Sequence, residues 1–480
     1  MNMTLRFVVA GVFLAVGTSQ GAAQALSRAD SALVHRILSA EDRRDSTASA
    51  LREGIRHADE RIRNLARRAR WRIADSAFVN RDSLPALPAP GTWPEPEWRL
   101  RYRALAQNRN DCSAMAAGLG DSAWPVRLRA ADLVTKACAQ HSAVVTTLRE
   151  WVDGLSIARA RRDPGTVTWH AAAHGIVGLA RVRPDEARPR ARRLASHDQW
   201  QVRMYAARAA GVLADTSPLR RLVLDRDPNV QEAAIDALSK LTGHADDSLY
   251  IAALSSNGPQ AVRAAAIALK GSPRADVASI ANATFDRWVR RGNATERDAR
   301  VALLEAAGRP ASDDRLPSDT ATVPRRAVSL ALGEDVRLRV TMSPMTGGGS
   351  FAVRLRGDNA PIMASRILEM ANRGYYDNGN WHRVEHDFVI QGAGPGSNEY
   401  TGYHFFLRDE LGNLPHTRGT VGMSTRGHHT GDAQWFINLK DNLRLIADYT
   451  VFAEVVEGID VVDGIMEGDV VQSIREIRLP

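Results

Sequence analysis

Apolar residues recur at helical spacing over a long first part of the chain, from about residue 26 to 308. This part is rich in Ala, Arg and Leu, and it lacks the alternation that is typical of strands. A short phrase returns in it: an acidic residue, turn residues, an aliphatic residue followed by Arg, then an Ala-rich helix. The copies contain Ile62-Arg63, Val126-Arg127, Val202-Arg203, Val230 and Val262-Arg263. This recurrence predicts stacked helices.

Neighbouring copies at Val202, Val230 and Val262 lie 28 and 32 residues apart. Units of this length, whose apolar faces only their neighbours can cover, predict an all-α solenoid over residues 26–308. The phrase resembles HEAT repeats, and the resemblance implies protein–protein binding and scaffolding. An irregular helical domain without a partner role is the alternative. Five prolines between Leu84 and Trp98 predict an extended excursion between helices.

The pattern changes after a polar, proline-containing linker, which we assign to residues 309–332. Apolar and polar residues then alternate in short runs across residues 333–480, and the run AVSLAL at 327–332 also fits a strand. Residues 359–374 predict a helix with Asn359 as its cap and Gly374 as its end. A second short helix is expected near residues 457–465. Short strands with two helices predict a mainly-β, closed antiparallel barrel capped by those helices.

The first 25 residues have the pattern of a signal peptide: Arg6, an apolar run, then the cleavage pattern Ala23-Gln24-Ala25. An uncleaved anchor or a buried helix is the alternative. We therefore expect an exported protein, in the bacterial periplasm, with no membrane span in the mature chain. Export permits a disulfide, for which Cys112 and Cys138 are the two candidates, although two free buried thiols fit the sequence as well.

Composition narrows the class of protein. The chain has 480 residues, of which 44% are hydrophobic and 25% charged, which excludes a mainly disordered chain, a collagen-like fibre and a multi-span membrane protein. Its net charge of +8 is unevenly placed. Residues 331–480 hold 14 basic and 20 acidic residues, whereas residues 26–330 hold 48 and 35. This predicts an acidic protein or envelope surface as partner, or contact between the two parts, rather than nucleic acid.

Three segments in the last third are similar to one known family. They are YYDNGNWHRVEHDFVIQGAGP at 375–395, GTVGMSTRGHHTGDAQWFINL at 419–439 and NLRLIADYTVFAEVVEGIDVVD at 442–463. In this order and spacing they resemble the cyclophilin-type peptidyl-prolyl isomerases, and the resemblance covers about residues 333–480. It implies a cyclophilin fold and catalysis of cis–trans isomerisation at X-Pro bonds.

This chemistry requires no nucleophile, metal or cofactor. Rotation about the amide crosses a barrier of about 18–20 kcal/mol, and an enzyme lowers it by binding the twisted state most tightly. The twisted prolyl nitrogen gains a lone pair, to which a guanidinium can donate without losing its own proton. The resemblance implies that Arg383 is this catalytic residue and that Gln391 positions the substrate. It implies substrate binding by Phe388, Val389, Phe436 and Leu445 around the proline ring, by Ser424, Thr425 and Gln434 along the groove, and by Tyr449, where many members have His.

Three positions depart from the family pattern. Val389 replaces the usual Met, Thr425 the usual Asn, and Arg444 a Trp of members that bind cyclosporin strongly. We expect weak cyclosporin binding but retained activity, because the Arg, Phe and Gln core is present. His428-His429 are interpreted as loop residues and not as a metal site, since no third ligand is placed nearby.

The sequence therefore predicts an exported prolyl isomerase that acts on proline-containing polypeptide clients. Its helical repeats are expected to recruit a client or protein partner. The alternative is a non-catalytic scaffold or holding chaperone that only binds proline-containing segments.

Overall fold

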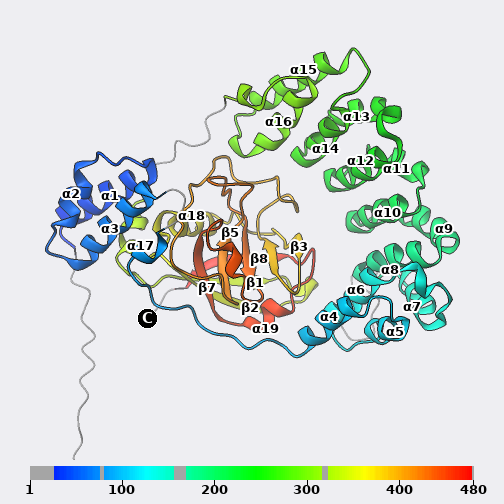
Figure 1. Ribbon diagram of the computed structural model, residues 1–480, viewed down its shortest axis with the longest axis horizontal. Coiled ribbons are helices and arrows are strands. Elements are labelled where there is room, and N and C mark those ends of the chain that lie inside the picture. The colour runs from blue at the N-terminus through cyan, green and yellow to red at the C-terminus, as the bar shows by residue number, and fades with distance from the viewer. Residues whose placement is uncertain (1–25, 76–79, 156–168, 316–322, 478–480) are drawn as a thin grey trace, which may run out of the picture.

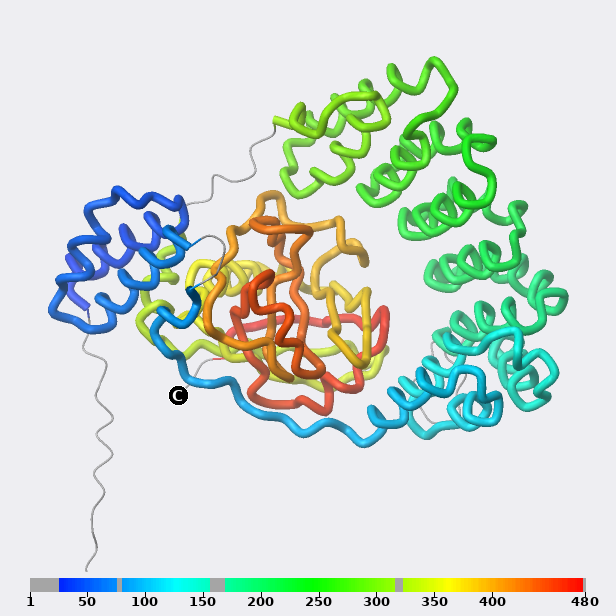
Figure 2. The backbone as a smooth tube through the Cα atoms, in the orientation of Figure 1, coloured from blue at the N-terminus to red at the C-terminus, as the bar shows by residue number. Residues whose placement is uncertain are grey.

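The computed structural model describes residues 26–75, 80–155, 169–315 and 323–477, so the predicted signal peptide at 1–25 lies outside the described residues. The chain builds three parts, which we call the N-terminal bundle, the helical arc and the sheet domain (Figure 1). The arc curves around one side of the sheet domain, and the bundle packs on another (Figure 2). None of the helices in the described ranges is long and apolar enough to cross a membrane.

The N-terminal bundle consists of α1 (Arg28–Arg43), α2 (Ser49–Ile55) and α3 (Glu60–Ala74). Side-chain oxygens of Ser27 and Asp59 accept backbone N–H groups at the starts of α1 and α3, which satisfies donors that a helix leaves free. Its apolar core continues into the sheet domain, because Ala327 and Ile362 are buried against it.

Residues 326–331 form helix α17 (Arg326–Ala331), so the strand predicted for AVSLAL is wrong. Ala327 and Leu330 are the buried positions of this helix. Their spacing of three residues fits a helical face, and six residues are too few for the alternation to distinguish helix from strand. The segment assigned to the linker thus contains a helix that packs on α1 and α18.

Residues 84–97, which we call the strap, run extended along the sheet domain, as their prolines predict. Carbonyls of Pro88 and Pro94 accept from Arg356 and Arg418, and the Trp93 indole donates to the carbonyl of Val455 at 3.2 Å. The strap connects the bundle to the arc across the surface of the sheet domain (Figure 2).

The helical arc covers residues 98–306. Even-numbered helices from α6 to α16 stack one on the next along its inner side, and α9, α11, α13 and α15 lie outside them (Figure 1). A single apolar core joins Tyr102 to Leu304. The helices are α4 (Trp98–Gln107), α5 (Cys112–Leu119), α6 (Trp124–Leu133), α7 (Ser142–Asp153), α8 (Trp169–Val182), α9 (Pro184–Leu194), α10 (Trp200–Val212), α11 (Thr216–Leu222), α12 (Pro228–Thr242), α13 (Asp247–Ala253), α14 (Pro259–Leu269), α15 (Val277–Val289) and α16 (Arg297–Ala306).

The recurring Arg performs one structural task in several copies of the repeated phrase. Its guanidinium donates to a backbone carbonyl six residues earlier, in the turn before its own helix, while the preceding aliphatic residue is buried. The pairs are Arg63 with His57, Arg127 with Asp121, Arg203 with His197 and Arg300 with Ala294, and Gln231 does the same with Asp225. The recurring phrase therefore marks a turn between two helices, and the side chain of the Arg or Gln in the phrase stabilises that turn by a hydrogen bond to its backbone.

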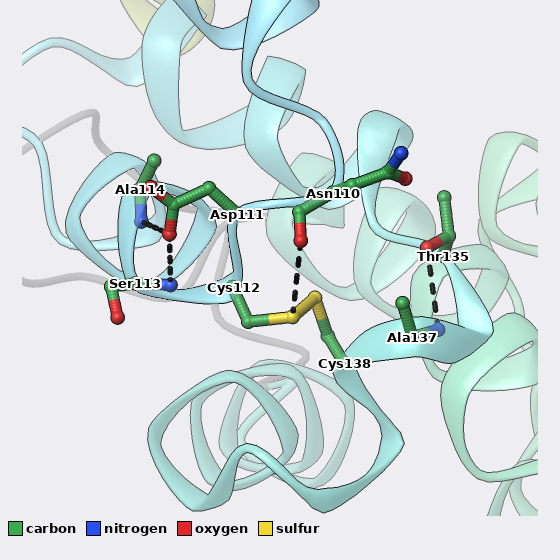
Figure 3. Close-up of a disulfide and its surroundings, with 8 residues drawn as sticks. All are labelled: Asn110, Asp111, Cys112, Ser113, Ala114, Thr135, Ala137 and Cys138. Atoms are coloured by element: carbon green, nitrogen blue, oxygen red, sulfur yellow. Dashed lines mark hydrogen bonds between the residues drawn. A yellow bond between two sulfur atoms is a disulfide. The ribbon is translucent and has the colours of Figure 1, made fainter.

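Cys112 and Cys138 are joined by a disulfide (Figure 3). The bond links the first residue of α5 to the 3-10 helix η2 (Lys136–Gln140), with 5.4 Å between the two Cα atoms. The Asp111 carboxylate caps α5 by accepting hydrogen bonds from the N–H groups of Ser113 and Ala114. This cap fixes the backbone on both sides of Cys112.

The sheet domain contains an eight-stranded sheet in the order β3-β4-β6-β5-β7-β2-β1-β8, and every neighbouring pair is antiparallel. Helix α18 packs against β7 and β8. The bounds are β1 (Arg337–Met342), β2 (Ser350–Leu355), α18 (Pro361–Asn372), β3 (Arg383–Val384), β4 (Val389–Gly392), β5 (Thr420–Met423), β6 (Trp435–Asn438), β7 (Val451–Glu457), α19 (Ile459–Asp463) and β8 (Val471–Ile477).

The sheet curves into a half-barrel whose end strands are β3 and β8. One isolated bridge, between Asn380 and Val470, joins the chain just before each end strand. The predicted full closure of the barrel stays a prediction. The two predicted helices are present as α18 and α19.

The start of α18 is capped from another part of the chain. The Glu410 carboxylate accepts the N–H groups of Ile362 and Met363 at 3.3 and 2.7 Å, whereas the Asn359 amide donates to the carbonyl of Val451. The predicted cap by Asn359 is therefore wrong, since a carboxylate fits the positive end of a helix better than a neutral amide.

The basic helical parts contact the acidic sheet domain directly. Arg99 and Arg103 of α4 pair with Asp463 and Asp387, each at 3.0 Å. At the other end of the arc the charges are reversed, because Asp298 pairs with Arg426 of the sheet domain at 2.5 Å. The arc is thus attached to the sheet domain at both of its ends.

Candidate active-site groove

An apolar cluster, at the position that the family resemblance assigns to the proline pocket, lies where β4, β6 and the 3-10 turn η7 (Leu443–Leu445) meet. Val389, Phe436 and Leu445 are buried together, and Phe388 and Tyr449 pack at their edge. In the antiparallel register Gln391 lies opposite Phe436, so alternate residues of both strands share one face. The neighbours Ile390 and Ile437 point the other way, into the core of the sheet domain. Strand alternation therefore separates pocket from core.

Arg383 lies on β3, directly opposite Gln391 of β4. Its guanidinium donates to the side-chain oxygen of Gln391 at 3.3 Å, and the Gln391 amide donates to the Ser424 hydroxyl at 2.8 Å. The Arg383 side chain is 46% exposed, and its nearest carboxylate oxygen, on Glu385, is 4.0 Å away. The guanidinium therefore lies beside the apolar cluster, 5.9 Å from the centroid of the Phe388 ring, and half of its side chain is exposed to solvent.

The Gln434 side chain is hydrogen-bonded to the loop around residues 398–401. Gln434 is 1% exposed, and its amide donates to the carbonyls of Asn398 and Thr401 at 3.0 and 2.8 Å. Its side chain therefore supports the loop around residues 398–401 from behind. Thr425 is half-buried beside Ser424.

Two further residues pack on this cluster, and the sequence analysis named only the first of them. The Arg444 guanidinium lies over the Phe388 ring, 4.8 Å from its centroid. The His416 ring stacks on Phe436 at 5.7 Å, and its Nε2 is 3.0 Å from the carbonyl oxygen of Tyr449. His416 belongs to none of the three family-like segments, so only the fold reveals its place.

Two histidines near the groove, His382 and His416, have strongly lowered pKa values. Burial lowers the pKa of His416 to about 4. Burial, assisted by the positive charge of Arg383, lowers the pKa of His382 to about 4. The chemistry open to this site at neutral pH is thus hydrogen bonding by a permanent cation beside an apolar ring pocket.

The helical arc faces this groove across a cleft. Two cavities, of about 320 and 350 Å³, lie between the inner helices and the edge of β3. Both are lined by Arg383 and His382 of the sheet domain, by Glu467 near its end, and by Arg208 of α10. The sequence analysis offered contact between the two parts as one expectation, but it did not place the arc beside β3.

The histidine pair interpreted as loop residues lies away from the groove. His428 Nδ1 is 3.0 Å from the Asp409 carboxylate, and the backbone N–H of His429 donates to the same oxygen. Within the described ranges no group of three or more His, Cys, Asp or Glu side chains has an arrangement that could hold a metal ion.

The curved antiparallel sheet thus carries an apolar cluster beside an exposed guanidinium and an amide that is fixed by a hydrogen bond. Comparison with known proteins agrees, since the profile of the family described as cyclophilin type peptidyl-prolyl cis-trans isomerase/CLD matches residues 339–478. The chain belongs to this family, and it is a peptidyl-prolyl cis-trans isomerase.

Three bacterial relatives illustrate the match. Peptidyl-prolyl cis-trans isomerase B of Escherichia coli (strain K12) is 37% identical over 131 residues, 25% of this chain and 80% of that protein. A peptidyl-prolyl cis-trans isomerase of Helicobacter pylori (strain ATCC 700392 / 26695) is 33% identical over 133 residues, 27% and 82% of the two chains. Peptidyl-prolyl cis-trans isomerase B of Bacillus subtilis (strain 168) is 31% identical over 130 residues, which are 27% of this chain and 91% of that protein.

Proposed function

We propose that this isomerase accelerates the folding of exported proteins at X-Pro bonds, with Arg383 as the catalytic residue. The observation that carries the proposal is the chain of contacts from Arg383 to Gln391 to Ser424 at the rim of the apolar pocket. A proline ring in this pocket brings its nitrogen toward the guanidinium. As the bond twists, Arg383 donates to the new lone pair and stabilises the transition state more than either planar state.

The other groove residues hold the substrate. Phe388, Val389, Phe436 and Leu445 enclose the proline ring, Tyr449 packs at the pocket edge, and Gln391 binds the peptide backbone beside the prolyl bond. Ser424 fixes the orientation of Gln391. Thr425 lies farther along the groove, and Gln434 acts indirectly through the loop that it supports.

Export is supported by the signal-like pattern of the first 25 residues and by the Cys112–Cys138 disulfide, a bond that persists mainly in oxidising compartments. The mature protein then begins at Leu26 in a bacterial periplasm. Its test is mass spectrometry of the chain recovered from fractionated cells. A periplasmic form that starts at Leu26 supports export, and an intact Met1 form in the cytosolic fraction contradicts it.

The helical arc is built of HEAT-like repeats, and its role is to recruit the unfolded client. This proposal is supported by the recurring turn-closing Arg and by the excess of basic residues in the helical parts. Recruitment raises the effective concentration of X-Pro bonds at the groove.

The test of recruitment compares refolding of a proline-limited acidic protein with turnover of an uncharged tetrapeptide, both with the full chain. Higher ionic strength screens the arc, so it should slow catalysed refolding several-fold and leave tetrapeptide turnover unchanged. Equal salt dependence of the two activities contradicts recruitment by charge. Binding of the client without any isomerisation would instead favour a holding chaperone.

A further inference from the structure

The last helix of the arc is joined to the sheet domain through one largely buried arginine. Arg426 lies in the segment between β5 and β6, and its side chain is 14% exposed. Its Nε donates to the Asp298 carboxylate of α16 at 2.5 Å, and one terminal nitrogen donates to the carbonyl of Thr295 at 3.1 Å. The other terminal nitrogen donates to the Asp432 carboxylate at 2.9 Å and to the carbonyl of Glu399. Arg426 thus connects the arc to two segments of the sheet domain.

Backbone contacts fix the arc at the same place. The Thr295 hydroxyl donates to the carbonyl of Tyr403 at 2.6 Å, and the N–H of Ala294 donates to the carbonyl of His404 at 3.2 Å. The N–H of Tyr403 in turn donates to the carbonyl of Asp432 at 2.8 Å. The turn that precedes α16 is therefore held against the segment between β5 and β6, and the acceptors that the arc offers to Arg426 have a defined position.

The segment that carries Arg426 also carries residues of the groove. Ser424 precedes Arg426 by two positions, and only Thr425 lies between them. The Ser424 hydroxyl accepts from the Gln391 amide at 2.8 Å, and the side-chain oxygen of Gln391 accepts from Arg383 at 3.3 Å. A displacement of Arg426 would therefore move the backbone that orients Gln391. A continuous series of contacts runs from α16 of the arc to the Arg383 guanidinium.

The arc and the sheet domain each satisfy one part of the same guanidinium. A guanidinium is planar and donates in fixed directions, so acceptors on several sides determine its orientation. On the sheet-domain side, the Asp432 carboxylate is only 1% exposed and keeps Arg426 close to β6. On the arc side, Asp298 and Thr295 determine in which direction the guanidinium points. Loss of the arc acceptors would leave Arg426 paired with Asp432 but free to turn.

We propose that Arg426 is a positioning residue of this isomerase, through which α16 of the arc fixes the groove segment that contains Ser424 and Thr425. The role rests on the proposed function of the groove, because it acts through Ser424 and Gln391 on the bound peptide. The arc is thereby a working part of the active site and does more than bring a client near it. An intact contact between Asp298 and Arg426 is then needed for tight peptide binding, even when the peptide never touches the arc.

The test separates KM from kcat for an uncharged Ala-Pro tetrapeptide, with the full chain and NMR exchange at several peptide concentrations. Asp298→Ala should raise KM about threefold and Arg426→Gln about tenfold, with kcat changed less than about twofold. The reason is that the groove segment holds the planar and the twisted peptide alike. The double variant should raise KM no more than Arg426→Gln alone, because both substitutions remove the same contact.

Glu305→Ala is the matched control, because Glu305 is on the same helix but pairs with Lys270 inside the arc at 2.9 Å, and its loss should leave KM unchanged. A wild-type KM in both Asp298→Ala and Arg426→Gln overturns the positioning role. So does a fall in kcat at unchanged KM, which is the result of partial unfolding. An active wild type whose KM ignores these substitutions refutes the positioning role alone, whereas a wild type without isomerase activity refutes the proposed function itself.

Discussion

Replacing Arg72 by methionine should detach the N-terminal bundle from the sheet domain. Arg72 of α3 is almost fully buried, and its guanidinium donates to Glu41 at 2.8 Å and to the carbonyls of Leu411 and Asn359, each at 2.7 Å. It also lies 4.0 Å from the carboxylate of Glu410, which caps α18. One side chain thus connects the bundle, the cap of α18 and the backbone of the sheet domain.

The magnitude follows from burial. Burial raises the pKa of Glu410 to about 7 even with Arg72 present. Removing Arg72 takes a cation away from Glu41 and Glu410 and removes the donor to three buried carbonyls, those of Leu411, Asn359 and Glu410. Loss of one member of a buried charge network costs about 3–5 kcal/mol. Methionine retains most of the side-chain volume, so the loss reports polar contacts and not a cavity.

Hydrogen exchange is the direct assay. Backbone amides of α1–α3 should exchange at least ~100-fold faster in Arg72→Met, because 1.4 kcal/mol corresponds to a factor of ten. Arg70→Ala is the matched control, since Arg70 is exposed on the same helix. Equal exchange in the two variants would refute the proposed connection.

Three further predictions follow from single features. Replacing Cys112 and Cys138 by Ser opens a loop of 26 residues and should lower the free energy of unfolding of the arc by about 3.5 kcal/mol. Chemical denaturation measures this loss, and equal unfolding midpoints for the variant and the wild type would contradict a structural role of the disulfide. The isomerase activity should change by less than about twofold between pH 9 and about pH 5.5. The reason is that the pKa values of His382 and His416 are lowered to about 4, so both side chains stay neutral over this range. A step in activity near pH 6.5 would contradict this. The stability that these neutral histidines contribute is present above pH 6.5 and is lost as the pH falls toward 4. Cyclosporin should bind no tighter than the micromolar range, and Arg444→Trp should strengthen its binding; sub-micromolar affinity of the wild type in calorimetry would contradict the interpretation of Arg444.

The parts of the site that could be predicted from the sequence are formed by residues that lie close together in the chain. Arg383, Phe388 and Gln391 lie on one hairpin, where strand register alone places Arg383 opposite Gln391. The recurring Arg of the helical phrase is likewise local, because its acceptor lies six residues earlier in the same turn. Short-range geometry of this kind follows from the order of residues.

The remaining features depend on contacts between distant segments. The cap of α18 comes from Glu410, about fifty residues later, and could not be distinguished in the sequence from a cap by Asn359. The burial of Gln434 behind its loop and the stacking of His416 on Phe436 also need the folded sheet. The approach of Arg208 to β3 needs the curvature of the whole arc, which no short segment of the sequence encodes.

The central claim is that a guanidinium at the rim of the proline pocket catalyses the isomerisation. Its most direct test is the rate of cis–trans exchange in a short Ala-Pro peptide, measured by NMR with the full chain, its Arg383→Ala variant and an Arg373→Ala control at an exposed position of the same domain. The account predicts that kcat/KM falls at least ~100-fold in Arg383→Ala and stays unchanged in the control. A loss of this size is expected when a hydrogen bond that stabilises only the transition state is removed. An Arg383→Ala variant that retains the wild-type rate would contradict it.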